Sequence, residues 1–155
     1  MKFLYQPTGI VIHHSATRDT ATISLDAIRN YHVKEMNWDD IGYHFVLELV
    51  DQSFVIGTGR GLQYVGAHTV GRNDMIGICV VGNFDETTLP LKELDRLLNL
   101  VAGIMMMYPY LTFDDIHYHR ETANKTCPGN NFPALEQIKA GVKLKTGFIK
   151  GERHG

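Results

Sequence analysis

The sequence has 155 residues, of which 44% are hydrophobic and 21% charged, and its formal net charge is −2 with the histidines counted as neutral. This length suits one domain that buries its own core, and the composition is typical of a folded globular protein. The charge balance argues against a nucleic-acid-binding protein, and no apolar run approaches the roughly 18 residues that a membrane-spanning helix needs.

The N-terminal part of the chain predicts a strand, a helix and a hairpin. Residues 9–13 form an apolar run of strand length that ends in a polar turn. Large or apolar residues then recur at helical spacing from Leu25 to Met36, and Ser24 is suited to cap the N-terminus of this helix. Residues 43–57 are rich in strand formers on both sides of a short polar turn, which indicates a β-hairpin.

The middle of the chain predicts a loop, a strand and a long helix. Residues 57–74 contain five glycines, and an irregular segment of this length is usually functional or disordered. The continuous apolar run of residues 75–82 predicts a central strand. Residues 89–109 are the clearest amphipathic helix, with Pro90 in a position that suits the first turn. The apolar stripe of this helix consists of Leu94, Leu97, Leu98, Val101 and Met105.

The C-terminal part predicts a short strand at residues 114–119, a helix at residues 132–143 and a frayed polar tail at residues 146–155. Strands and helices alternate along the chain except for the one hairpin. We therefore expect a mixed central β-sheet flanked by about three helices, in the α/β or α+β class. The chain 1–155 is expected to be a single domain with its core at about residues 9–145.

Two residues near the C-terminus have the chemistry of metal ligands. His119 and Cys127 lie at the two ends of a polar segment that can loop around an ion. Zinc prefers nitrogen and sulfur ligands and keeps one of four positions open in catalytic sites, so a third protein ligand is needed. The candidates are His13 and His14 at the end of the first strand. Adjacent side chains of a strand point to opposite faces, so only one of them can face the ion, and periodicity alone does not choose between them.

Ordinary packing is the alternative for each of these residues. A buried histidine is more often a packed side chain than a ligand, and packing is the interpretation of His32, on the apolar side of its helix. Cys79 lies within an apolar strand, which favours a small, buried and inert side chain. Cys127 differs because its neighbours in the sequence are polar. It is therefore the stronger candidate for a ligand.

Four segments, in this order along the chain, define a family resemblance: "IVIHHSAT", "IGYHF", "VGAHTVGRNDMIGICVVGNFD" and "HRETANKTCPG". Together they resemble the zinc-dependent N-acetylmuramoyl-L-alanine amidases that share a fold with the peptidoglycan recognition proteins, and especially the small phage endolysins of that family. The resemblance covers roughly residues 9–138. It implies hydrolysis of the amide bond between the lactyl group of N-acetylmuramic acid and L-alanine.

The resemblance also implies a ligand set for one zinc ion. His13 matches the first ligand of the family, and His14 matches the variable residue that follows it. His119 matches the second ligand and Cys127 the third. His117 aligns with no ligand, so it is interpreted as a strand residue or as a partner of a ligand.

Further site residues follow from the same resemblance. Tyr43 resembles the active-site tyrosine, whose hydroxyl would orient the water or shuttle a proton; the alternative is an aromatic residue of the core. Lys125 resembles the lysine that endolysins use, where it would stabilise an oxyanion; the alternative is a solvated surface lysine. His68 and Asn73, in the glycine-rich loop, are implied to bind the muropeptide; the alternative for Asn73 is a simple turn residue. Glu121 is a candidate acid–base group or partner of a ligand.

The expected partner is bacterial peptidoglycan, and we expect neither nucleic-acid binding nor a membrane span. The chain is expected to be a monomer. An unidentified regulatory protein is a further candidate partner. The first residues show no signal peptide. We therefore expect synthesis in the cytoplasm and action on the cell wall after release, as in a phage-infected host. Two alternatives stay open: a module that binds peptidoglycan without cutting it, and a cytoplasmic amidase that recycles wall fragments. Recycling enzymes often have an aspartate at the position of Cys127, so Cys127 favours the lytic branch.

Overall fold

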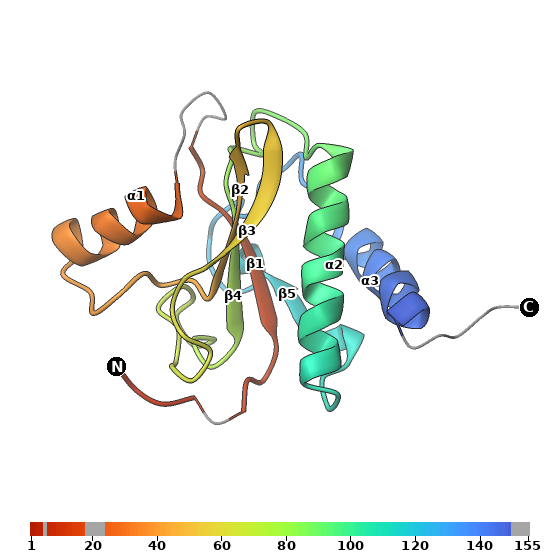
Figure 1. Cartoon of the computed structure of the whole chain (residues 1–155), viewed down its shortest axis with the longest axis horizontal. Helices are drawn as coiled ribbons and strands as arrows, with labels where there is room; N and C mark the ends of the chain where they lie inside the picture. The colour runs from red at the N-terminus through yellow and green to blue at the C-terminus, as the bar shows by residue number, and fades with distance from the viewer. Residues whose placement is uncertain (5, 18–23, 150–155) are drawn as a thin grey trace, which may run out of the picture.

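The computed structural model describes residues 1–4, 6–17 and 24–149. A five-stranded sheet with the strand order β3-β2-β4-β1-β5 forms its centre (Figure 1). The strands are β1 (Ile10–His14), β2 (Phe45–Val50), β3 (Ser53–Thr58), β4 (Ile76–Val80) and β5 (Ile116–Tyr118). The hairpin strands β2 and β3 pair antiparallel, and the other neighbouring strands pair parallel. The sheet is therefore mixed, as predicted.

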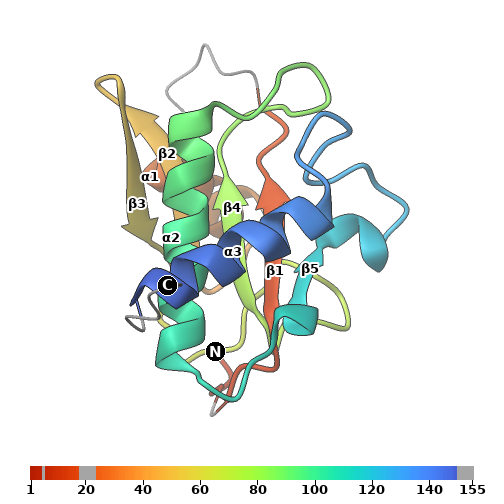
Figure 2. The same cartoon turned by 90° about the vertical axis from the view of Figure 1, so that its right-hand side faces the viewer.

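Within the described residues, three α-helices flank the sheet. They are α1 (Leu25–Asn30), which continues into a π-helical turn (Tyr31–Glu35), α2 (Leu91–Met107) and α3 (Leu135–Ile149). Figures 1 and 2 show α2 and α3 together over one face of the sheet and α1 on the opposite side. Among the described residues, no helix is long and apolar enough to cross a membrane. The predicted fold class is confirmed.

The middle strands β1 and β4 are buried because both of their faces are covered. All five residues of β1 and all five of β4 are buried, which is typical of parallel strands between two layers. On the helical face, Ile12 and Ile78 belong to the same core cluster as Val101 of α2 and Val142 of α3. The opposite face has a smaller cluster that includes Cys79, which is fully buried as predicted.

The helix signals in the sequence are also confirmed. Ser24 caps α1, since its Oγ accepts a hydrogen bond from the backbone N–H of Ala27 at 3.1 Å. In α2, the predicted stripe faces the core: Leu97 and Val101 are fully buried. Pro90 is the N-cap of α2, directly before its first residue. Local capping by Ser24 therefore stabilises the start of α1, and periodicity accounts for the orientation of α2.

Several predicted boundaries are wrong. The strand expected from residue 114 begins only at Ile116, because Phe113–Asp115 form a 3-10 helix. β5 ends at Tyr118, so His119 begins a short 3-10 helix (His119–Glu121) instead of ending the strand. The last helix extends to Ile149, so the tail expected from residue 146 does not begin there. The hydroxyl of Thr146 donates a hydrogen bond to a carbonyl of its own helix at 2.9 Å, and such a bond lets a polar residue continue a helix. Residues 150–155 of the predicted tail lie outside the described residues.

Candidate metal centre

The three predicted ligands meet in the folded chain. One ligand atom from each of His13, His119 and Cys127 lies within 4.8 Å of the other two. The ring centroids of His13 and His119 are 4.6 Å apart, and the Sγ atom of Cys127 is 3.8 Å from Nδ1 of His13. These distances give the group the size of a single-ion site.

The register of two parallel strands brings the histidines together. Ile12 of β1 pairs with Tyr118, the last residue of β5, so His13 in β1 and His119 directly after β5 reach the same edge of the sheet. Neighbouring strands lie about 4.8 Å apart, and side chains at equivalent positions share a face. The structure therefore places His13, and not His14, on the side of His119.

Asp85, in the turn after β4, holds the loop that brings Cys127 to the histidines. Its Oδ2 atom accepts a hydrogen bond from Thr126 Oγ1 at 2.6 Å, and its Oδ1 atom accepts one from the backbone N–H of Asn130 at 2.8 Å. These bonds stabilise the carboxylate and lower the pKa of Asp85. The backbone N–H of Arg120 donates to the carbonyl of Cys127 at 2.9 Å. Sequence reasoning missed Asp85; the available signal was its place after the central strand, at the same edge of the sheet as the C-terminal end of β1.

Burial controls the protonation of the three candidate ligands. Burial, followed by the charges of His68 and His119, lowers the pKa of His13 well below its ordinary value. Burial, followed by the charge of Lys125, also lowers the pKa of His119. Burial raises the pKa of the Cys127 thiol to about 11. The imidazoles therefore offer lone pairs at neutral pH, and the thiol becomes a ligand when a bound cation favours its deprotonation.

The donor set fits zinc. His13 is 1% exposed and Cys127 is 8% exposed, so two nitrogen donors and one sulfur donor meet in a site that excludes most water. Zinc prefers these ligand types, and three protein ligands leave its fourth position open. Hard cations such as calcium and magnesium prefer oxygen ligands, which this group does not supply.

A cavity of about 390 Å³ opens onto the candidate ligands. Its lining consists of His13, His14, Ser15, Ala16, Tyr43, Asp85, His119, Lys125, Thr126 and Cys127. Tyr43 and Lys125, both predicted to act in catalysis, therefore share this cavity with the three candidate ligands. A substrate held in it would meet the ligand group, a phenol and an ammonium group together.

Tyr43 keeps its hydroxyl proton at neutral pH. Its ring centroid is 5.1 Å from that of His13. Burial, followed by the charges of Cys79 and Cys127, raises the pKa of Tyr43 well above its ordinary value. The phenol is therefore a hydrogen-bond donor in this site at neutral pH and does not act as a phenolate.

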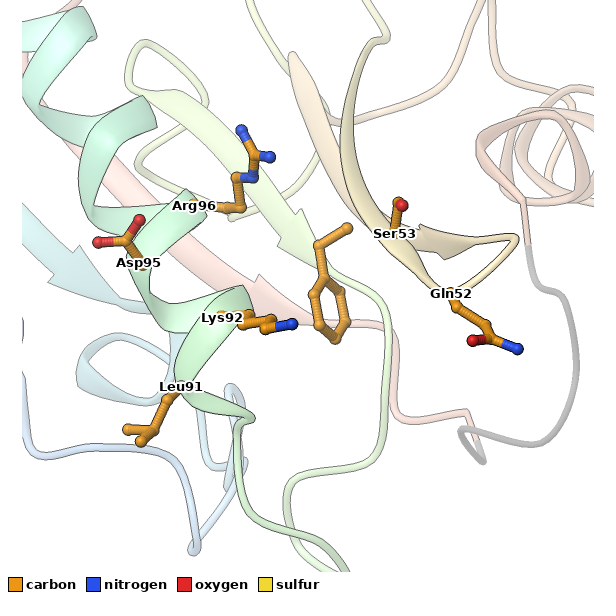
Figure 3. Close-up of a pocket in the computed structure, with 7 residues that line it drawn as sticks. Gln52, Ser53, Leu91, Lys92, Asp95 and Arg96 are labelled. Carbon is orange, nitrogen blue, oxygen red and sulfur yellow. The ribbon is translucent and has the colours of Figure 1, made fainter.

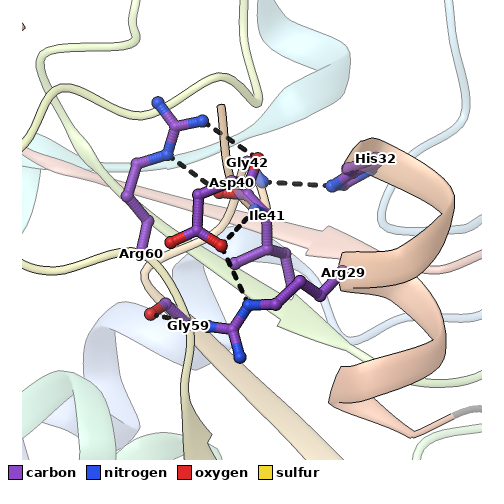
Figure 4. Close-up of polar contacts among 7 residues, drawn as sticks. All are labelled: Arg29, His32, Asp40, Ile41, Gly42, Gly59 and Arg60. Atoms are coloured by element: carbon purple, nitrogen blue, oxygen red, sulfur yellow. Dashed lines mark hydrogen bonds and ion pairs between the residues drawn. The ribbon is translucent and has the colours of Figure 1, made fainter. Parts of the chain in front are cut away.

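Other elements hold the backbone that leads into Tyr43 (Figure 4). Arg60 is 6% exposed. Its guanidinium donates hydrogen bonds to the backbone carbonyls of Asp40 at 3.1 Å and Ile41 at 2.8 Å. His32 accepts a hydrogen bond at Nδ1 from the backbone N–H of Gly42 at 3.0 Å. His32, interpreted from the sequence as a packed residue, thus also holds the backbone at Gly42, directly before Tyr43.

His68 lies behind His13 and is not part of the cavity lining. Its Nδ1 atom is 3.0 Å from Nε2 of His13 and 3.0 Å from Oγ1 of Thr69, and its Nε2 atom is 3.0 Å from the carbonyl oxygen of Met75. Burial lowers the pKa of His68 to about 3. The Oδ1 atom of Asn73 accepts the backbone N–H groups of His68 and Thr69, each at 2.8 Å. Substrate binding by His68 and Asn73 stays a prediction, whereas these contacts point to support of His13.

Three further residues, His44, His117 and Glu121, have partners outside the ligand group. His44, which is 1% exposed, accepts the backbone N–H of Gly77 at Nδ1 (3.0 Å) and donates from Nε2 to the carbonyl of Tyr64 (2.8 Å). His117 on β5 lies 3.1 Å from a carboxylate oxygen of Glu121. These contacts give His44 and His117 structural partners, and they place Glu121 beside β5.

A second cavity adjoins the first. Its volume is about 490 Å³, and it shares Ser15 and Tyr43 with the cavity at the candidate ligands. The rest of its lining consists of Thr17, Ala27, Ile28, Tyr31, His32 and Cys79. This surface, between α1 and the sheet, can accommodate an apolar part of a ligand next to the candidate metal centre.

A third cavity, of about 600 Å³, lies between the turn of the β2–β3 hairpin and the start of α2 (Figure 3). Lys92 and Arg96 extend from α2 on the side of the hairpin, whereas Asp95 points away from it. Asp95 instead binds Lys145 of α3 at 2.5 Å. This cavity shares no residue with the candidate metal centre.

Comparison with known proteins agrees with this geometry. Residues 4–130 match a family model described as N-acetylmuramoyl-L-alanine amidase. The endolysin of Klebsiella phage KP32 is 31% identical over 129 residues, which is 79% of this chain and 81% of that protein. Peptidoglycan-recognition protein SC2 of Drosophila melanogaster is 30% identical over 78% of this chain and 67% of its own length. The solved endolysin amidase LysCS from Clostridium intestinale superposes with a TM-score of 0.79 and is 31% identical, covering 92% of this chain and 87% of its own.

Proposed function

Since the chain belongs to the N-acetylmuramoyl-L-alanine amidase family, we propose that it hydrolyses peptidoglycan with the help of one zinc ion held by His13, His119 and Cys127. The scissile bond is the amide between the lactyl group of N-acetylmuramic acid and the L-alanine of the stem peptide. The observation that carries this proposal is the meeting of three candidate ligand atoms within 4.8 Å at the wall of a cavity.

The metal answers the main chemical difficulty of amide hydrolysis, which is to produce a nucleophile at neutral pH. A zinc ion in such a site supplies Lewis-acid polarisation of the carbonyl and a water whose pKa is lowered toward about 7. The products follow from adding one water across the bond. The lactyl group gains a carboxylate, and the peptide leaves with a free amino group on its L-alanine.

The residues of the chain itself supply charge stabilisation and substrate positioning. The ammonium group of Lys125 lines the same cavity as the three ligands, so it can stabilise the negative charge that develops on the carbonyl oxygen. Tyr43 retains its proton, so its hydroxyl can donate a hydrogen bond to that oxygen or orient the attacking water. The apolar cavity that adjoins at Tyr43 gives the rest of the substrate a place to bind.

The biological setting in this proposal is that of an endolysin, which acts on the wall of a host cell after release. The likeness to the endolysin of Klebsiella phage KP32 over most of both chains supports it. The likeness to a peptidoglycan-recognition protein supports a second candidate, a module that binds peptidoglycan without cutting it. The complete ligand set and the neighbouring Lys125 favour the enzyme, because binding alone requires neither.

Mass spectrometry of digested, purified peptidoglycan tests the proposal. We expect peptides that begin with L-alanine. We also expect intact glycan strands in which the lactyl group of each cleaved N-acetylmuramic acid is a free carboxylate. Chelation of metal should stop the digestion, and added zinc should restore it. Cys127→Ser should bind peptidoglycan and leave it uncut. Cut glycan strands, or equal digestion by Cys127→Ser and by the unaltered chain, would overturn the proposal.

A further inference from the structure

The two ring nitrogens of His13 face different partners. Nδ1 lies 3.8 Å from Sγ of Cys127, on the side of the candidate ligands. Nε2 lies 3.0 Å from Nδ1 of His68 and 3.2 Å from Oγ1 of Thr69. A neutral imidazole has a proton on one nitrogen and a lone pair on the other. His13 therefore offers a lone pair to a metal through Nδ1 only while its proton resides on Nε2.

The surroundings of His68 determine where the proton of His13 resides. Nε2 of His68 is 3.0 Å from the carbonyl oxygen of Met75. A carbonyl oxygen only accepts, so this nitrogen bears the proton and Nδ1 of His68 keeps its lone pair. That lone pair faces Nε2 of His13, so the hydrogen bond between the two rings runs from His13 to His68. The hydroxyl of Thr69 can accept a hydrogen bond from Nε2 of His13 and donate one to Nδ1 of His68. This arrangement also requires the proton of His13 on Nε2.

The imidazole of His68 sits in a space that two glycines leave open. A Cβ atom at Gly77 would come within 2.4 Å of Cδ2 of His68, and one at Gly66 within 2.5 Å of the same atom. The backbone of the loop is held in turn by Asn73, whose side-chain oxygen accepts the N–H group of His68. The ring is thus fixed by packing on its edge and by hydrogen bonds at both nitrogens.

We propose that His68 is a positioning residue for the metal centre, which holds the proton of His13 on Nε2 and aims Nδ1 of His13 at the ion. The relay runs from the carbonyl of Met75 through His68 to His13. This inference rests on the proposed function, because it takes His13 as a zinc ligand. Partners of this kind set the tautomer and the orientation of a metal-binding histidine, and their loss typically costs roughly 10- to 100-fold in metal affinity.

The first test is the tautomer of His13 in the metal-free full-length protein. Nitrogen NMR on ¹⁵N-histidine-labelled protein distinguishes a protonated ring nitrogen from one with a free lone pair. We expect a neutral His13 with its proton on Nε2, and a neutral His68 with its proton on Nε2. A His13 that bears its proton on Nδ1 would overturn the inference, and this readout requires neither zinc nor activity.

The second test is zinc affinity, measured by competition with a chromophoric chelator. His68→Phe fills the same space without hydrogen bonds, and we expect its affinity to fall roughly 10- to 100-fold. His68→Gln offers an amide oxygen toward His13 and an amide N–H toward Met75, so it should recover most of the loss. His44→Phe is the control, because His44 is a neighbouring buried histidine whose hydrogen bonds go to Gly77 and Tyr64 and not to His13; it should keep the original affinity.

The outcomes separate this inference from the function on which it rests. If the unaltered protein binds zinc and His68→Phe binds it equally well, the role of His68 is wrong while the metal centre stands. If the unaltered protein takes up no zinc, the proposed function itself is wrong. If His68→Phe does not fold, as judged by circular dichroism, the tautomer of His13 in the unaltered protein decides the question alone.

Discussion

A methyl group added at Gly77 tests how rigidly the interior behind His13 is built. In Gly77→Ala the new Cβ atom would lie 2.4 Å from Cδ2 and 2.6 Å from Cγ of His68, which is closer than any packed carbon atoms approach. The ring cannot move aside freely, because hydrogen bonds hold it to His13 and to Met75. Overpacking of this kind costs about 1–3 kcal/mol, and one lost hydrogen bond adds about 1 kcal/mol. We expect the free energy of unfolding to fall by about 2–4 kcal/mol.

Urea unfolding at 25 °C, followed by circular dichroism, measures this loss. For a chain of this size, 1 kcal/mol corresponds to about 2–4 °C in Tm, so a thermal scan should show a drop of roughly 4–16 °C. Gly103→Ala is the control, since a Cβ atom at this exposed position of α2 meets nothing within 4 Å. Alanine is the better helix former there, and we expect a gain of about 0.5–1 kcal/mol. A Gly77→Ala variant as stable as the unaltered chain would refute the rigid placement of His68.

Three further predictions concern pH, the cysteine loop and catalysis. Burial lowers the pKa of His44 below its ordinary 6.5, so at lower pH the unfolded chain binds a proton that the folded chain does not, and stability falls. His44→Gln should therefore reduce the slope of unfolding free energy between pH 6.5 and pH 5 by up to about 1.4 kcal/mol per pH unit, and equal slopes would contradict this. Asp85→Asn cannot accept both hydrogen bonds that hold the Cys127 loop, so zinc affinity should fall roughly tenfold, while Asp95→Asn, another exposed aspartate, should leave it unchanged; equal losses would refute the anchoring. Lys125→Gln should lower kcat by roughly 100-fold without weakening zinc binding, and a variant that loses zinc instead would show that Lys125 serves the metal centre.

Local features of the sequence were sufficient for most of the secondary structure. The Ser24 cap, the apolar stripe of α2 and the apolar run of β4 depend on residues that are neighbours along the chain. The same holds for the hairpin, whose two strands are joined by a short turn. The end of α3 was misjudged because Thr146 and the glycines near it are poor helix formers, and its contact with the rest of the fold overrides that preference.

The candidate site divides along a similar line. Residue chemistry alone nominated His119 and Cys127, with His13 or His14 as the third ligand, and the motif resemblance chose His13 and added Lys125 and Tyr43. The cavity brings the three candidate ligands, Lys125 and Tyr43 together. Asp85, Arg60 and His32 were not predicted to support the site, because each acts on residues that are distant in sequence.

The sequence by itself thus determined which elements form, which residues have the chemistry of a metal site and which family the chain resembles, because these properties reside in single side chains and short spacings. Only the tertiary structure showed how His13, the ligand that the resemblance implied, reaches His119, since this depends on the register between β1 and β5. It also placed His68 in contact with His13, while substrate binding by His68 stays a prediction. The direction of the hydrogen bond between His13 and His68 depends on the position of the Met75 carbonyl, and no periodicity in the sequence predicts that position.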